Sequence, residues 1–270
     1  MKNAQTHLIK AIDINPEFAD AHHELALILI NQGEYKLAKK HLLKVIKIDS
    51  EFMQAFFNLA LLYGKMGEKI KSKEFFLKAI DLDPNFPDAY YHYGLLLSEM
   101  EDYEGAKTNL EKVTDLDQNH YKAYYHLAKL LIDPEDYEKA KKYYLIAIDI
   151  DASMSDAHYY LGKLLSGGLQ NDKDGTLVIK PEYDNAIIHY KKAIRINKNY
   201  AKAHYNLALV FKIQKNYDKS RKHFERAIKI VNDYAKAHFH LAMLLKETGE
   251  LSSSKSSRPT PGVKKKNINR

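Results

Sequence analysis

The chain has 270 residues, of which 45% are hydrophobic, so it can bury a core, and its length predicts one or two domains. It contains no cysteine, which excludes disulfides, thiolate metal sites and cysteine nucleophiles. The net charge is +7, but residues 252–270 ("SSSKSSRPTPGVKKKNINR") carry six basic and no acidic side chains, and the rest of the chain carries 36 basic and 35 acidic ones. The nearly neutral body argues against a nucleic-acid partner on composition, and the tail predicts a basic disordered segment.

No segment is long and apolar enough to cross a bilayer, and the N-terminal residues lack the apolar core of a signal peptide. We therefore expect a cytoplasmic protein with no membrane partner.

A sequence repeat runs through the body of the chain. Closely related segments occur as "ADAHHELAL", "MQAFFNLAL", "PDAYYHYGL", "YKAYYHLAK", "SDAHYYLGK", "AKAHYNLAL" and "AKAHFHLAM". The fourth residues of these segments are 34 residues apart, except for one interval of 46. Below, each repeat is numbered from position 1 to position 34, and Ala19 is position 1 of the first full repeat. The twelve extra residues of the long interval are left out of this numbering.

Each repeat predicts two amphipathic helices, because apolar residues recur with i, i+3, i+4, i+7 spacing in both halves. Small residues at positions 8 and 20 allow the two helices to approach closely. Asp, Asn or Pro near positions 31 and 32, as in "DINPEF" and "DLDPNF", ends each second helix.

The period and the fixed positions resemble the tetratricopeptide repeat family, a family of helix–turn–helix repeats. The sequence departs from the family pattern at three points. No repeat has Trp at position 4, the proline of position 32 remains only as Pro16 and Pro84, and one repeat carries the insert. The resemblance implies an all-α fold, a right-handed superhelical solenoid of antiparallel helix pairs.

The repeat register predicts an array over residues 1–251 and a tail over residues 252–270. Within the array we expect a lone second helix at 4–18, full repeats at 19–52, 53–86, 87–120, 121–154, 155–200 and 201–234, and a capping first helix at 235–248.

The resemblance also implies that the first helices line a concave groove, with positions 2, 5, 6, 9 and 12 facing inward. Position 5 is aromatic in six of seven cases, position 6 carries hydrogen-bonding groups, and the C-terminal half is rich in lysine. The predicted peptide-binding residues are Phe57, Tyr91, Tyr125, Tyr159, Tyr205, Phe239, Asn58, His92, His126, Asn206, His240, Lys129, Lys163, Lys202 and Lys236.

From these residues we expect a non-catalytic scaffold that binds a peptide or a partner protein in the groove. The bound part would be an acidic segment or a C-terminal carboxylate, and the protein would be a monomer or weak oligomer. Other interpretations stay open: the rings pack between repeats, the lysines are only solvated, the basic tail or groove binds RNA, or the array is the targeting arm of a larger enzyme or assembly.

Nothing in the sequence predicts a catalytic centre, a metal or a cofactor. It contains no HExxH motif, Gly-rich phosphate loop or nucleophile elbow. The histidines at position 4 (His22, His158, His204 and His238) occupy the slot that the family fills with Trp or Tyr, which predicts a packing role.

The twelve extra residues fall in the turn between the two helices of repeat 155–200. Asp172, Asp174 and Gly175 fit part of a calcium loop, but Gln170 and Pro181 stand where two further ligands belong. The sequence near 167–180 favours a short β-hairpin instead, since "NDKDG" forms turns and Leu177, Val178 and Ile179 favour a strand.

Overall fold

The computed structural model describes residues 2–131, 133–167 and 181–249. Fourteen α-helices and one short 3-10 helix make up these ranges, and no strand occurs in them, so the described chain is all-α as predicted. The predicted hairpin and the predicted basic tail lie outside the described residues. No described helix is both long and apolar enough to cross a membrane.

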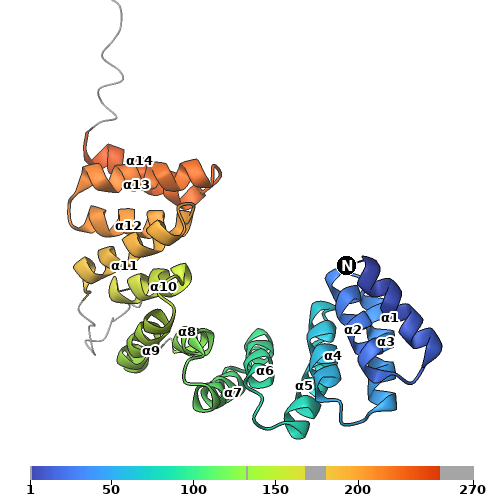
Figure 1. Cartoon of the computed structure of the whole chain (residues 1–270). Coiled ribbons are helices and arrows are strands. Elements are labelled where there is room, and N and C mark those ends of the chain that lie inside the picture. Colours follow the sequence, from blue (N-terminus) through green and yellow to red (C-terminus); the bar gives the residue numbers. More distant parts are fainter. Residues whose placement is uncertain (1, 132, 168–180, 250–270) are drawn as a thin grey trace, which may run out of the picture. The chain divides into compact units, whose positions relative to one another are not determined.

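The helices form two compact units, which are described separately (Figure 1). The first unit comprises α1 (Lys2–Ile14), α2 (Ala19–Asn31), α3 (Tyr35–Ile48), α4 (Met53–Lys65), α5 (Lys69–Leu82), α6 (Pro87–Glu99), α7 (Tyr103–Leu116), α8 (Tyr121–Leu130), η1 (Pro134–Asp136) and α9 (Tyr137–Ile150). The second unit comprises α10 (Ser155–Leu165), α11 (Tyr183–Ile196), α12 (Ala201–Ile213), α13 (Tyr217–Ile230) and α14 (Ala235–Glu247). In each repeat the first helix packs against the second helix that follows it.

A tight turn with a left-handed residue at position 15 joins most of these pairs. Gly33 and Gly67 adopt φ values of 81° and 77°, and Glu101 and Lys215 adopt 65° and 57°. The N–H of position 16 donates to the C=O of position 11, as from Glu34 to Leu29 at 2.9 Å. This hydrogen bond is the one that closes a Schellman motif at a helix C-terminus.

The repeat that carries the insert keeps the same closing bond. Glu182 N–H donates to Leu165 C=O at 2.7 Å, across the extra residues, and α10 still packs against α11. The two helices of this repeat thus stay packed against each other, as in the other repeats.

Most second helices end as the sequence predicted, at an Asp or Asn in position 31, whereas α13 ends at Ile230, before Val231. The side chain of Asp49 accepts from the N–H of Glu51 at 2.9 Å, and Asp83, Asp117 and Asn197 make the same contact two residues on. Such a local bond competes with continuation of the helix and turns the chain towards the next repeat.

In the six repeats that have both helices, the small residues at positions 8 and 20 lie where the two helices cross, and they are almost fully buried. At Gly162 an added Cβ would lie 2.9 Å from the ring of Tyr190, which fills the space between α10 and α11. At two crossings a serine hydroxyl bonds the facing helix: Ser72 donates to the C=O of Ala60 at 2.7 Å, and Ser220 donates to that of Ala208 at 2.8 Å.

We expect Ser220→Ala to lower the free energy of unfolding by less than about 1 kcal/mol, because the lost hydrogen bond is partly offset by the better helix propensity of alanine. Ser220→Val should cost more, about 1–3 kcal/mol, because its branched side chain forces α12 and α13 apart. Urea unfolding of the two variants measures the difference. Equal stability of the valine and alanine variants would show that the crossing is not tightly packed.

Candidate functional site

All the predicted peptide-binding residues lie on first helices. They are distributed over α4 (Phe57, Asn58), α6 (Tyr91, His92), α8 (Tyr125, His126, Lys129), α10 (Tyr159, Lys163), α12 (Lys202, Tyr205, Asn206) and α14 (Lys236, Phe239, His240).

The position-5 rings of the first unit pack between neighbouring repeats. Tyr91 and Tyr125 are buried and Phe57 is half-buried. The Phe57 ring contacts that of Phe86 at a centroid distance of 5.1 Å, and Tyr91 contacts His120 at 4.8 Å. In both cases the partner stands at position 34, just before the next first helix, so these rings serve mainly to join repeats.

The second unit has the same arrangement up to its last helix. The buried rings of Tyr159 and Tyr205 contact Tyr200 and Tyr234 at 4.9 and 5.2 Å. Phe239 on α14 differs, because 60% of its surface is exposed.

The position-6 side chains pack against position 5 of the preceding repeat. Asn58 Nδ2 lies 3.0 Å from His23 Nε2, and Asn206 Nδ2 donates to the Tyr159 hydroxyl at 3.0 Å. The rings of His92, His126 and His240 contact Phe57, Tyr91 and Tyr205 respectively. These groups are half-buried, so part of their polar surface is already used inside the array.

Burial keeps the position-6 histidines uncharged at neutral pH. It is the largest cause that lowers the pKa of His126 to about 4, and the nearby Lys129 adds to it. Burial likewise lowers the pKa of His92 and of His240. These rings therefore act as neutral hydrogen-bonding groups, not as cations.

The predicted lysines stay exposed. In the second unit Lys163, Lys202 and Lys236 project from α10, α12 and α14, and none of them forms an ion pair within residues 153–167 and 181–249. By contrast, Lys212 lies 3.1 Å from the carboxylate of Glu247. In the first unit Lys129 lies over the ring of Tyr125, at 5.3 Å from its centroid.

A pocket of about 480 Å³ in the first unit includes two of the predicted residues, His126 and Lys129. It opens between α6, α7 and α8, and its remaining lining consists of Leu95, Ser98, Tyr103, Glu104, Leu110, Leu130 and Asp133. The repeat pattern did not predict this pocket. The sequence feature that could have indicated it is "IDPED", which departs from the turns of the other repeats. Here α8 ends at Leu130, earlier than the other first helices of the unit, and Pro134 begins a 3-10 turn.

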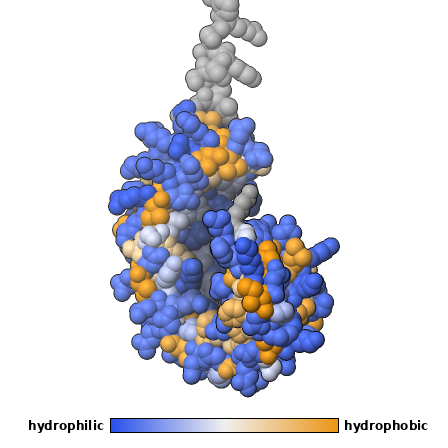
Figure 2. Space-filling model, turned by 45° about the vertical axis from the view of Figure 1, so that its right-hand side comes forward, coloured by the Kyte–Doolittle hydropathy of each residue, from blue (hydrophilic) through white to orange (hydrophobic). Residues whose placement is uncertain are grey.

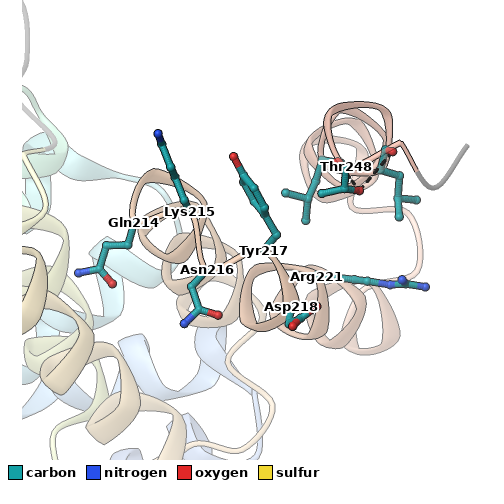
Figure 3. A pocket seen from close by; sticks show the side chains of 9 residues that line it. Gln214, Lys215, Asn216, Tyr217, Asp218, Arg221 and Thr248 are labelled. Carbon is teal, nitrogen blue, oxygen red and sulfur yellow. Dashed lines mark hydrogen bonds between the residues drawn. The ribbon is translucent and has the colours of Figure 1, made fainter.

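A second pocket, of about 500 Å³, lies in the second unit beside the turn between α12 and α13 and the end of α14 (Figure 3). Its lining is mostly polar, with Gln214, Lys215, Asn216, Tyr217, Asp218, Arg221 and Thr248 beside Leu244 and Leu245. On the face seen in Figure 2, hydrophilic residues cover most of the surface and hydrophobic ones form small separate areas.

Three of the position-4 histidines, His22, His158 and His204, are buried as predicted, with partners that the repeat pattern did not predict. For the fourth, His238, the prediction was wrong, because this side chain is exposed on α14. His22 Nδ1 lies 2.8 Å from His41 Nδ1, and the pairs His158–His189 and His204–His223 have Nδ1–Nδ1 distances of 3.0 and 2.9 Å. Each partner lies on the second helix, at position 23 of its repeat. The recurrence of histidine at this position was the feature of the sequence that could have predicted the pairs. The described residues contain no group of three or more His, Cys, Asp or Glu side chains that could hold a metal.

Sequence comparison finds tetratricopeptide repeat models along most of the body. They match residues 7–40, 54–86, 75–108, 121–154 and 201–234, and a further model described as a TPR repeat matches 177–214. The chain belongs to the tetratricopeptide repeat family. Proteins of this family commonly act as protein–protein interaction scaffolds. No curated protein sequence matches this chain.

Several solved tetratricopeptide repeat structures share the fold. YrrB, described as having an unusual peptide-binding site, is 23% identical with a TM-score of 0.59, over 74% of this chain and 96% of that one. PilF of Pseudomonas aeruginosa is 18% identical with a TM-score of 0.70, over 83% and 97%. The Cut9–Hcn1 structure from the APC/C is 17% identical with a TM-score of 0.67, over 90% and 46%. At these identities the similarity shows the fold alone.

Proposed function

We propose that this tetratricopeptide repeat protein is a non-catalytic scaffold whose second unit binds an acidic segment of a partner protein. The observation that carries the proposal is the row of Lys163, Lys202 and Lys236 on three successive first helices, exposed and without a carboxylate partner in the described part of the unit. An acidic segment would supply the missing charges.

The three lysines stand at related points of the repeat. Lys202 and Lys236 occupy position 2 and Lys163 occupies position 9, which is two helical turns further along the same side of a first helix. Asn206 and His240 are half-buried and stand at position 6, one helical turn beyond Lys202 and Lys236, and hydrogen-bonding groups of this kind suit the amides of an extended chain.

No carboxylate in the described part of the second unit forms an ion pair with these three lysines. Asp156 accepts a hydrogen bond from the hydroxyl of Tyr200, and Glu247 pairs with Lys212. The peptide-binding site described for YrrB gives a precedent for peptide recognition on this fold.

The test is a fluorescence titration of the full chain with a labelled Glu/Asp-rich decapeptide, in amidated and free-carboxylate forms. We expect the triple variant Lys163→Gln, Lys202→Gln and Lys236→Gln to weaken binding at least about fivefold, since three exposed charge contacts contribute about 1–3 kcal/mol together. The free-carboxylate form will bind more tightly only if the site takes a C-terminus.

The matched control replaces exposed lysines on the second helices, as Lys191→Gln, Lys222→Gln and Lys229→Gln, which gives the same net charge. Binding by this control should change less than about twofold. Equal weakening by both triple variants would refute a specific site. Tighter binding of single-stranded RNA than of the peptide, lost with the first triple only, would favour the nucleic-acid interpretation.

A further inference from the structure

The last described helix, α14, leaves open the face that other first helices bury. His238 at position 4 and Ala242 at position 8 are exposed on it. In the preceding first helices position 8 is buried throughout, and position 4 is buried or half-buried against the second helix. The face of α14 thus has the form of a first helix on which no second helix packs among residues 181–249.

The first helix of the chain, α1, shows the complementary face. In the repeat count it is a second helix, with Ala4, His7, Leu8 and Ala11 at positions 20, 23, 24 and 27. Ala4 and His7 are exposed, and Leu8 and Ala11 are half-buried. At positions 20, 24 and 27 every other repeat has a buried side chain.

The two open faces carry matching side chains. Inside the array position 4 pairs with position 23, and in most repeats the two residues are of one kind: three His–His pairs, Phe56–Phe75 and Tyr124–Tyr143. The position-4 residue of α14 is His238 and the position-23 residue of α1 is His7. These two would make a fourth His–His pair.

The orientation of His238 already suits this pair. Its Nε2 lies 2.9 Å from the C=O of Asn232, just as Nε2 of His22 lies 3.1 Å from that of Pro16. A carbonyl only accepts, so Nε2 carries the proton and Nδ1 of a neutral ring is left as an acceptor. In His22 that Nδ1 faces His41, and in His238 it is available for a donor on a second helix.

A second match involves the rings that join repeats. Position 5 contacts position 34 of the same repeat, as in His23–Phe52, Phe57–Phe86 and Tyr205–Tyr234. On the open faces these positions are Phe239, 60% exposed, and Phe18, 42% exposed. Both are among the large hydrophobic side chains that the protein leaves in contact with water.

We propose that α14 of one copy docks on α1 of a second copy, and that the two helices complete one 34-residue repeat with His238 against His7 and Phe239 against Phe18. The contact joins two different surfaces. Each added copy therefore leaves one surface of each kind open, and such head-to-tail contacts build open chains or rings rather than symmetric dimers.

The test is sedimentation of the full chain from about 1 µM to about 1 mM, a range that covers weak contacts. The average mass should rise above 31.2 kDa with concentration. Ala242→Glu and Ala4→Glu each place a long charged side chain where two helices must cross. Since both alanines are exposed, each variant should remain folded by circular dichroism but stay at the monomer mass.

Mixing the two variants identifies the geometry. Ala242→Glu keeps an intact α1 face and Ala4→Glu keeps an intact α14 face, so an equimolar mixture should form two-copy complexes and nothing larger. Leu77→Glu, an exposed position on α5, should associate like the natural chain. The double variant His238→Phe, His7→Phe, which copies the Phe56–Phe75 pair, should associate more strongly than His238→Phe alone.

A natural chain that stays at the monomer mass throughout the range would overturn the proposal. So would an Ala242→Glu variant that associates normally, or a mixture that stays monomeric although the natural chain associates. None of these outcomes depends on peptide binding by the lysine row.

Discussion

Replacing Phe224 with alanine should lower the free energy of unfolding of the second unit by about 3–5 kcal/mol. The Phe224 side chain is fully buried and packs against the rings of Tyr205 and His240, which come from two successive first helices. One truncation therefore opens a cavity inside a repeat and also weakens the contact with the next one. In repeat arrays stability is close to a sum of repeat and interface contributions, so both losses count.

Urea unfolding followed by circular dichroism measures this effect. Ile188→Ala is the matched control, because this side chain on α11 is apolar but half exposed, and we expect a loss below about 1 kcal/mol. Similar losses for the two variants would show that the Phe224 site relaxes to fill the cavity.

Lowering the pH from 7.5 to about 4.5 should destabilise the second unit by up to about 5 kcal/mol through its two His–His pairs. Burial is the main cause that lowers the pKa of His189 and of His223 to about 4, and the partner histidine is the next. Lys192 and Lys191 act in the same direction. An unfolded histidine has a pKa near 6.5, so between these values the unfolded chain binds more protons. The stability is therefore full above about pH 6.5 and is lost as the pH falls towards 4.

Carboxylates also titrate near pH 4 and contribute to the loss of stability. A variant without one His–His pair therefore shows how much of the loss the histidines cause. The double variant His204→Phe, His223→Phe copies the Phe56–Phe75 pair of the same array, whose ring centroids are 6.2 Å apart. Its unfolding free energy should change less between pH 7.5 and 4.5 than that of the natural chain. An unchanged pH dependence would assign the effect to other groups.

The repeat period, the helix pairs and their ends could be predicted because each depends on local pattern. The spacing of apolar residues predicts the helices, and in most repeats the Asp or Asn at position 31 predicts where the second helix stops. A regular repeat count does not anticipate the early end of α8 before the 3-10 turn at Pro134, or the pocket whose lining includes Leu130 and Asp133.

The site could be predicted less well, since a ring on a first helix has three available neighbours: its own second helix, the next repeat and solvent. The spacing of residues in the sequence cannot distinguish a ring that packs against the next repeat from a ring that faces solvent. The deciding residue is the aromatic at position 34, such as Phe86 or Tyr234, which covers the position-5 ring of the same repeat. The groove as a whole, the array boundaries and the roles assigned to the site residues stay predictions.

The side-chain pairs between positions 4 and 23 have a consequence for how the chain reaches its native state. Every first helix of a repeat protein resembles every other, so a newly folding chain can pair a first helix with the second helix of the wrong repeat. In this chain an exchange between a His–His repeat and the repeat with Phe56 and Phe75 sets an imidazole against a phenyl ring and leaves a buried Nδ1 without a partner, which costs about 1–3 kcal/mol. Wherever two repeats carry different kinds of ring, the pairs thus distinguish the correct partner from a shifted one and discourage helix-exchanged forms while the array assembles.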